Sequence, residues 1–305
     1  MIVVVGESLV DVVEDPGHPE HERETVGGSP LNVATTLAGL DVPTMLITEV
    51  GHDDRGRRIV EWVEASGAEL IAAPSRTGRT ATATVRLDAG EASYDFDIGW
   101  SLQHQELPHC DALHVGSLGT VLEPGRNSVL DLVDQAWARD VFVSYDPNVR
   151  APLVGDPVQA WADVEALAAR AQLVKLSDQD AAVLQPGADA EDIARSLLQG
   201  ERTELVLLTR GSEGAVGFAG DLVVRVPAAE VRVADTVGAG DAFMAATLAV
   251  LFEGSAFGSY GAGVPADEPR LERILRAAVE VAGITCSRPG AAAPTRPELR
   301  PDWPA

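Results

Sequence analysis

The stretch "VADTVGAGDAF" (233–243) decides how the rest of the chain is interpreted. Two glycines and an alanine lie between two aspartates, immediately before an apolar run that ends at 252. This pattern predicts a helix from about 239 to 252 with a glycine-rich entry. The first N–H groups of a helix lack partners, and its dipole places about +0.5 charge there. Gly238, Ala239 and Gly240 would therefore form an anion hole made of backbone alone.

Asp241 stands where a phosphate-binding P-loop carries lysine. A carboxylate beside a bound phosphate repels it, so its value there must be chemical. The role that fits is a general base, which takes a proton from a hydroxyl as that hydroxyl attacks phosphorus. A carboxylate that merely caps the helix above a tight turn explains the pattern equally well. A dinucleotide fingerprint fits less well, because Phe243 occupies the place of the third glycine.

Composition limits the partners of this chain. Its 305 residues carry 23 basic and 47 acidic side chains, a net charge of −24. A surface that acidic repels nucleic acid and anionic lipid, so neither is expected as a partner. Lys175 is the only lysine. Cys110 and Cys286 lack metal-ligand spacing, the start lacks a signal-peptide pattern, and the run 242–252 is too short to cross a bilayer, so we expect a cytoplasmic protein.

Strands and helices alternate along most of the sequence. Continuous apolar runs, typical of a parallel sheet that is covered on both faces, occur at 2–6, 44–50, 112–117, 141–146, 171–176 and 204–209. Helical patterns occupy 30–40, 54–66, 124–138, 157–170, 178–184 and 189–199. This order predicts an α/β fold in three layers, with a doubly wound, mostly parallel sheet. No composition shift divides the chain, so 1–305 is expected to be a single domain.

Residues 80–97 interrupt this alternation. Their period-2 polarity on both sides of "DAG" predicts an antiparallel hairpin, and a second hairpin is expected at 215–226. The first hairpin would protrude from the main sheet and, as a segment of about 78–100, join 11–25 in a small β-sheet lid. Such a lid leaves an exposed sheet edge, and pairing two lids would bury it, so we expect a homodimer.

Further motifs accompany the opening stretch in a fixed order. They are "GESLVD" (6–11), "GGSPLNVA" (27–34) and "GHDDRG" (51–56). With "DTVGAGDAF", they resemble the ribokinase-like (PfkB) carbohydrate kinases over essentially the whole chain. The stretches "ASYDF" (92–96), "DPNVR" (146–150), "TRGSEGA" (209–215) and "SRPGAAAPT" (287–295) are similar to the fructokinase branch. The resemblance implies a ribokinase-like fold and ATP-dependent phosphorylation of a sugar hydroxyl, fructose first among the candidates.

The resemblance assigns the sugar subsite to residues from several motifs. Asp11 would accept hydrogen bonds from sugar hydroxyls, and Gly27 and Gly28 would let the sugar lie against bare backbone. Asn32 would present its amide to the sugar, while Ser29 and Pro30 form an N-cap and N1 pair for the helix that follows. Phe96 would lie in the lid, Arg150 would reach the sugar or the transferred phosphate, and Asp241 would be the base, with Gly238, Ala239 and Gly240 as its anion hole.

The same resemblance implies a nucleotide site and two ions. Thr209, Gly211 and Gly214 would line the nucleotide, and Lys175 would approach its phosphates. Mg²⁺ would bind with ATP. Where the family has N-x-x-E, this chain has Ser177 and Asp180, so Asp180 would hold Mg²⁺ through water. Asp235 would be a ligand of a monovalent cation, K⁺.

Alternatives remain at this stage. A kinase for 2-keto-3-deoxygluconate needs cations in the lid, where Arg79 and Arg86 are the candidates. A nucleoside kinase needs aromatic rings there, and Tyr94, Phe96 and Trp100 are available. A sugar-binding regulator on the same fold would be free to lose the base. The sequence names neither the sugar, nor the hydroxyl, nor the oligomeric state.

Overall fold

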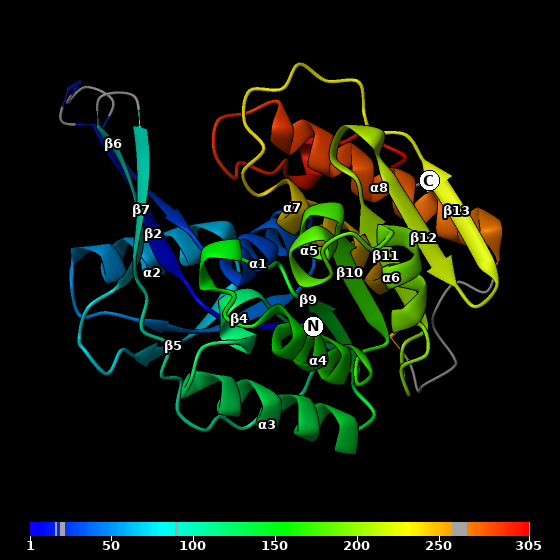
Figure 1. Cartoon of the computed structure of the whole chain (residues 1–305), viewed down its shortest axis with the longest axis horizontal. Coiled ribbons are helices and arrows are strands. Elements are labelled where there is room, and N and C mark those ends of the chain that lie inside the picture. The colour runs from blue at the N-terminus through cyan, green and yellow to red at the C-terminus, as the bar shows by residue number, and fades with distance from the viewer. Residues whose placement is uncertain (16, 19–21, 89–90, 258–266, 305) are drawn as a thin grey trace.

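A large sheet and a small sheet organise the chain (Figure 1). The computed structural model describes residues 1–304 except 16, 19–21, 89–90 and 258–266. The large sheet has nine strands in the order β13-β12-β11-β10-β9-β8-β1-β4-β5. Its neighbouring strands are parallel except at β11–β12 and β12–β13. The bounds are β1 Ile2–Val5, β4 Thr44–Val50, β5 Glu69–Pro74, β8 Ala112–Gly116, β9 Phe142–Asp146, β10 Leu173–Ser177, β11 Leu205–Thr209, β12 Ala215–Ala219 and β13 Leu222–Val226.

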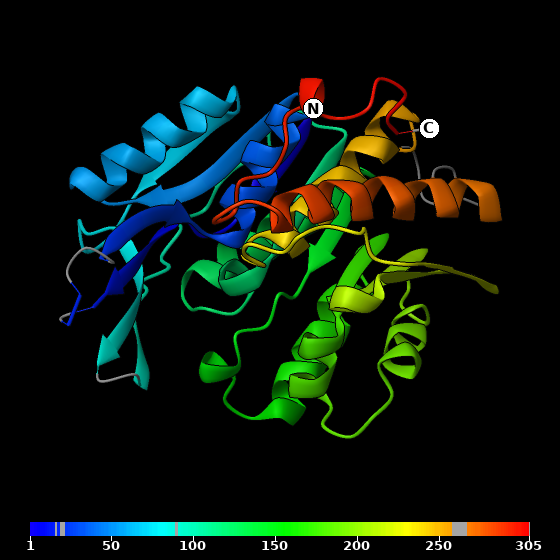
Figure 2. The same cartoon turned by 90° about the horizontal axis from the view of Figure 1, so that it is seen from above.

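Helices cover both faces of this sheet, which confirms the expected three layers (Figure 2). One face is covered by α1 (Ser29–Gly39), α2 (Asp54–Ser66), α7 (Ala239–Glu253) and α8 (Glu268–Cys286). The other face is covered by α3 (Gly125–Ala138), α4 (Pro157–Ala168), α5 (Asp178–Leu184) and α6 (Ala190–Leu197). Strand β5 and helix α8 were absent from the sequence-based prediction; the other strands and helices lie within two residues of it.

Strand sequences explain the two cores. Successive side chains of a strand point to opposite faces, so Ile2 and Val4 of β1 belong to the core that includes α1 and α7, while Val3 and Val5 belong to the core that includes α3. All four are fully buried. A strand between two helical layers needs apolar residues at every position, which is why these runs lack polar alternation.

The small sheet has the order β3-β2-β6-β7 and lies to one side of the large one (Figures 1 and 2). Its strands are β2 (Leu9–Glu14), β3 (Arg23–Gly27), β6 (Ala81–Asp88) and β7 (Glu91–Asp97). The expected hairpin is confirmed: β6 and β7 pair antiparallel, while β2 pairs parallel with β6. The small sheet thus joins two segments that lie about 70 residues apart in sequence.

The topology decides where a ligand can bind. From β1 the chain continues to β4 on one side, and β8 pairs with β1 on the other, so the strand order reverses there. In open α/β sheets, ligands bind beyond the carboxyl ends of the strands at this point. Among the residues that the structure describes, no helix is both long and apolar enough to span a bilayer.

Candidate active site

A cavity of about 960 Å³ lies at the carboxyl ends of the large sheet and reaches from the small sheet to α7 and α8; we call it the cleft. It gathers residues from most of the motifs that the sequence analysis singled out, although neither 51–56 nor 287–295 contributes to its lining. Asp11, Gly28, Asn32, Phe96, Arg150 and Asp241 line it, together with Lys175, Asp180, Thr209, Gly211, Gly214, Gly238, Ala239 and Gly240. Gly27 lies directly behind Asp11, and Asp235 is absent from the lining.

Asp241 lies in the first turn of α7 and is 5% exposed. Its Oδ1 accepts hydrogen bonds from Ser29 Oγ at 2.7 Å and Asn148 Nδ2 at 3.1 Å, and its Oδ2 accepts one from Asn32 Nδ2 at 2.8 Å. Three donors from two other parts of the chain thus fix the orientation of this carboxylate. A carboxylate with two oxygens has about four acceptor positions, so about one remains unoccupied by these three donors.

These contacts correct one expectation and refine another. Gly28 is the N-cap of α1, with no side-chain cap bond, so the prediction that Ser29 caps this helix is wrong. The Ser29 hydroxyl instead donates a hydrogen bond to Asp241, which lies 212 residues away in sequence. Asn32, which was expected to face the sugar, donates to Asp241 in this structure.

The N-terminus of α7 is open to the cleft. Its N-cap, Gly238, has a left-handed φ of 75° and makes no side-chain cap bond. A Cβ at Gly238 would come within 2.5 Å of the Cβ of Ala291, so glycine is required there by both backbone and space. Gly238, Ala239 and Gly240 all line the cleft, where the free N–H groups of a helix start attract an anion.

Lys175 lines the cleft beneath this helix start and is almost wholly buried. It is 3% exposed, and its Nζ donates to Asp146 Oδ2 at 3.0 Å. A Cβ at Gly240 would lie 3.0 Å from the same Nζ, so the ammonium group packs against the backbone of the first turn. Burial alone would lower the pKa of Lys175, but the negative charges of Asp146, Asp180 and Asp241 raise it above its ordinary value. The residue therefore stays charged.

The end of the cleft where the sequence analysis expected the sugar, here called the sugar end, is acidic and closely packed. A Cβ at Gly27 would come within 2.4 Å of Asp11 Oδ2, and one at Gly28 (φ 111°) within 2.7 Å of the carbonyl oxygen of Glu7. Burial raises the pKa of Asp11, Arg150 opposes this shift, and Asp241 adds to it. Glu7, which the sequence analysis missed, also lines the cleft and accepts from the Gly119 N–H at 2.9 Å; burial raises its pKa to about 7.

The lid candidates for other substrates lie elsewhere. Arg79 pairs with Asp97 at 2.9 Å and Arg86 pairs with Glu14 at 3.6 Å, in exposed positions outside the cleft lining. Trp100 is buried and donates from Nε1 to the Gly119 carbonyl, so it is not free to stack on a base. The side chain of Tyr94 lies outside the described residues.

The end of the cleft where the sequence analysis expected the nucleotide, here called the nucleotide end, is lined largely by glycines and small apolar side chains. Gly211 and Gly214 have positive φ values of 50° and 95°, and a Cβ at Gly214 would come within 2.1 Å of the Val226 carbonyl oxygen. Thr209 ends β11 at the same rim. Helix α8 adds a wall that the sequence analysis missed, made of Val279, Ala282, Gly283 and Cys286.

The two candidate ion ligands are already hydrogen-bonded. Asp180 Oδ1 accepts from the Val149 N–H at 2.7 Å, and Oδ2 accepts from the N–H and Oγ of Ser177 in a capping box. These three bonds occupy three of the carboxylate's roughly four acceptor positions and leave about one, enough for a water. Asp235 accepts from the N–H groups of Val237 and Gly290, which lower its pKa. Among described residues, no cluster of three His, Cys, Asp or Glu side chains could hold a metal.

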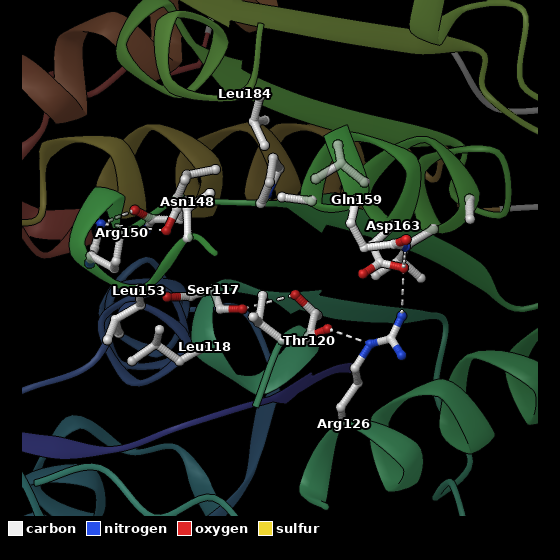
Figure 3. Close-up of a pocket in the computed structure, with 18 of the residues that line it drawn as sticks. Ser117, Leu118, Thr120, Arg126, Asn148, Arg150, Leu153, Gln159, Asp163 and Leu184 are labelled. Atoms are coloured by element: carbon white, nitrogen blue, oxygen red, sulfur yellow. Dashed lines mark hydrogen bonds and ion pairs between the residues drawn. The ribbon is translucent and has the colours of Figure 1, made fainter. Parts of the chain in front are cut away.

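A second cavity of about 430 Å³ lies behind the cleft, between α3, α4 and the segment 147–156 (Figure 3). Leu118, Asn148 and Arg150 line both cavities and form the wall between them. At the far end, Arg126 reaches Asp163 at 3.3 Å. The other lining residues are mostly apolar.

Comparison with known proteins agrees with this geometry. Residues 1–298 match the profile of the pfkB family of carbohydrate kinases. A fructokinase of Rhizobium leguminosarum bv. trifolii is 32% identical over 265 residues, which cover 82% of this chain and 79% of that protein.

Two solved structures share the fold. An ATP-bound fructokinase of Xylella fastidiosa aligns with a TM-score of 0.83 and 26% identity, covering 97% of this chain and 96% of that one. A fructokinase variant of Vibrio cholerae, with fructose, ADP and potassium bound, aligns with a TM-score of 0.78 and 24% identity, covering 95% and 93%.

Proposed function

The chain belongs to the pfkB family of carbohydrate kinases, and we propose that it transfers the γ-phosphoryl group of ATP to a hydroxyl of fructose, with Asp241 as general base. The observation that carries the proposal is the carboxylate of Asp241, oriented by three hydrogen-bond donors in the first turn of a helix whose N-terminus opens to the cleft. A base and an anion-binding backbone, side by side, are what phosphoryl transfer to a hydroxyl requires.

The chemistry divides between the two groups. Asp241 takes the proton of the attacking hydroxyl, and Gly238, Ala239 and Gly240 offer backbone N–H groups to the transferred phosphoryl group. Lys175 adds a buried positive charge beneath these glycines. Because donors fixed before the reaction need no reorganisation, this arrangement favours the transition state over the bound substrate.

Nucleotide and ions bind around this centre. ATP would lie along Thr209, Gly211 and Gly214. Mg²⁺ neutralises the phosphates of ATP and keeps most of its waters, and Asp180 has one acceptor position left for such a water. Asp235 would face K⁺ near the loop at Gly290, whose N–H already donates a hydrogen bond to Asp235 Oδ2.

A neutral sugar fits the sugar end better than a sugar acid or a nucleoside. Asp11, Glu7 and Asp241 gather there, and Arg79 and Arg86, the cations that a sugar acid would need, are paired outside the cleft. Trp100 is buried and hydrogen-bonded to Gly119, so its ring is not available to stack on a base, which weakens the case for a nucleoside. Hydroxyl groups suit buried carboxylates because they donate hydrogen bonds without carrying charge.

A coupled assay across a panel of acceptors tests the proposal. With MgATP present, kcat/KM is expected to be highest for fructose, lower for 2-keto-3-deoxygluconate and lowest for adenosine. A preference for 2-keto-3-deoxygluconate or for adenosine would assign the other substrate class. Measurable sugar binding without any phosphoryl transfer across the panel would make the protein a sugar-binding regulator. Chelation of divalent ions should abolish turnover, and its restoration by Mg²⁺ but not by Na⁺ tests the metal requirement.

We also propose a homodimer that pairs the small sheets. The edge strands β3 and β7 leave unpaired backbone groups, which a second copy would satisfy. Light scattering of the purified protein in a cytoplasm-like buffer tests this, and a monomer at all concentrations would contradict it.

A further inference from the structure

The turn 146–150 forms the wall between the cleft and the second cavity. Asn148 and Arg150 line both cavities, and Figure 3 shows their side chains joined at one end of the second cavity. The sequence analysis assigned no role to Asn148, and the proposed function counts it only as one of the three donors to Asp241. Its position between the two cavities raises two questions: which groups fix Asn148, and which groups Asn148 fixes in turn.

Buried carboxylates fix the backbone of this turn. Asn148 has a left-handed φ of 39°, and its N–H donates to Asp146 Oδ1 at 3.1 Å. The next N–H, that of Val149, donates to Asp180 Oδ1 at 2.7 Å. Asp146 is held in turn by the buried ammonium group of Lys175. Since a cavity lies on the far side, these hydrogen bonds rather than close packing set the conformation of the turn.

The side-chain amide of Asn148 is fully used. Its Nδ2 donates to Ser29 Oγ at 2.7 Å and to Asp241 Oδ1 at 3.1 Å. Its Oδ1 accepts from Arg150 Nη1 at 2.5 Å. One amide therefore links the carboxylate of the base to the guanidinium group of Arg150.

We propose that Asn148 is a positioning residue for phosphoryl transfer, which orients Asp241 and holds Arg150 at the cleft through the two ends of one amide. This inference rests on the proposed role of Asp241 as base. Its physical content is geometric: the amide determines which acceptor position of Asp241 stays free for the hydroxyl, and misplacement of a reacting group by about 1 Å costs about 10²-fold in rate.

Charged groups surround this contact on every side. Asp11 approaches Asp241 from β2, Asp146 from β9 and Lys175 from β10, with Arg150 beyond the amide. An amide is the neutral group that can both donate to a carboxylate and accept from a guanidinium group. A carboxylate at position 148 would satisfy Arg150 but would repel Asp241.

Two substitutions separate the amide from the backbone. Asn148→Gly keeps the left-handed conformation, which glycine adopts without strain, and removes the amide. We expect kcat to fall about 10-fold to 100-fold, while KM for ATP stays within about threefold because the nucleotide end is untouched. Asp41→Gly is the matched control, since Asp41 also has a left-handed φ of 63° and is exposed at the far end of α1, and it should leave kcat unchanged.

Asn148→Asp supplies a readout that a merely structural role would not move. When protonated, the new carboxyl donates to Asp241 as the amide does; when ionised, it repels it, because adjacent carboxylates share one proton. The ratio of variant to wild-type kcat should therefore fall as pH rises from 5.5 to 8.5. Unchanged circular dichroism and sugar affinity would show that the fold is intact, and if Asn148→Gly does not fold, Asn148→Asp carries the test.

The outcomes distinguish this inference from the proposed function. If Asp241→Asn retains turnover, the base assignment fails, and this inference with it. If Asp241→Asn is inactive but Asn148→Gly keeps kcat within twofold of wild type, the positioning role alone is overturned. A ratio for Asn148→Asp that does not depend on pH overturns it as well.

Discussion

Two neighbouring parts of the cleft offer different chemical groups to a ligand. At the sugar end, side chains do the work: Asp241 is held by Ser29, Asn32 and Asn148, and Asp11 packs against the backbone of Gly27. At the start of α7, which we call the phosphate end, the backbone does it, because Gly238 and Gly240 present the main chain to the cleft without side chains. The difference teaches that the sugar end should respond to changes of side-chain chemistry, and the phosphate end to the addition of a single carbon atom.

Among changes outside Asp241, Gly238→Val should give the largest effect, because it displaces the backbone at the start of α7. The new side chain would overlap Ala291 and would disfavour the left-handed φ of 75°, so the first turn of α7 must move. Loss of such an anion hole costs about 10² to 10³ in kcat. The matched control is Gly187→Val, with a φ of 86° and open space around it, which should affect stability but not kcat.

Glu7→Gln tests how much stability the protein loses when the buried carboxyl group of Glu7 ionises. The unfolded chain releases this proton near pH 4.5 and the folded protein near 7, so the free energy of unfolding falls as pH rises across that window. The glutamine keeps an acceptor for the Gly119 N–H but never ionises. The free energy of unfolding of the variant, relative to that of wild type, should rise by about 3 kcal/mol between pH 4 and pH 8. Denaturant titrations at both pH values measure this, and an equal difference at both would refute the assignment.

Gly27→Ala probes the sugar end through a neighbour. Its Cβ would overlap Asp11 Oδ2 and push this carboxylate out of place, while the backbone of position 27 needs no positive φ. Loss of a buried charged hydrogen bond costs about 1 to 3 kcal/mol, so KM for the sugar should rise about 5-fold to 150-fold. KM for ATP should not change. Gly99→Ala, where the space is open, serves as the control.

Arg79→Ala should have the smallest effect. Its ion pair with Asp97 is exposed, and such pairs contribute about 1 kcal/mol or less. Because Arg79 does not line the cleft, kinetics with a neutral sugar should match wild type. A large rise in KM for the sugar would show that the outer face of the small sheet takes part in binding.

Sequence alone predicted the elements whose signals are local. Helix α2 begins after Asp53, which accepts from the Gly56 N–H, and ends at Gly67 in a left-handed conformation, so both limits are visible in the sequence. The sequence analysis did not predict the edge strand β5, because one of its faces is exposed and its pattern of polar and apolar residues is mixed. The sequence analysis did not predict helix α8, because charged residues interrupt the apolar side that packs on α7.

The site followed the same rule. Motifs indicated Asp241 and its glycines, because the chemistry of that stretch is contained in a few residues. The partners of Asp241 lie 93 to 212 residues away, and no local pattern states that they meet. Asn148 stood within the quoted "DPNVR", yet its role depends on a backbone conformation that the sequence does not display.

The most direct test of the account is the kinetics of Asp241→Asn, measured together with sugar and ATP affinity. The substitution keeps the size of the side chain but removes the proton acceptor. We expect sugar and nucleotide affinities within about threefold of wild type and kcat lower by about 10² to 10⁴. Full turnover by this variant with the best sugar of the panel would contradict the account, because Asp241 would then hold the helix start and do no chemistry.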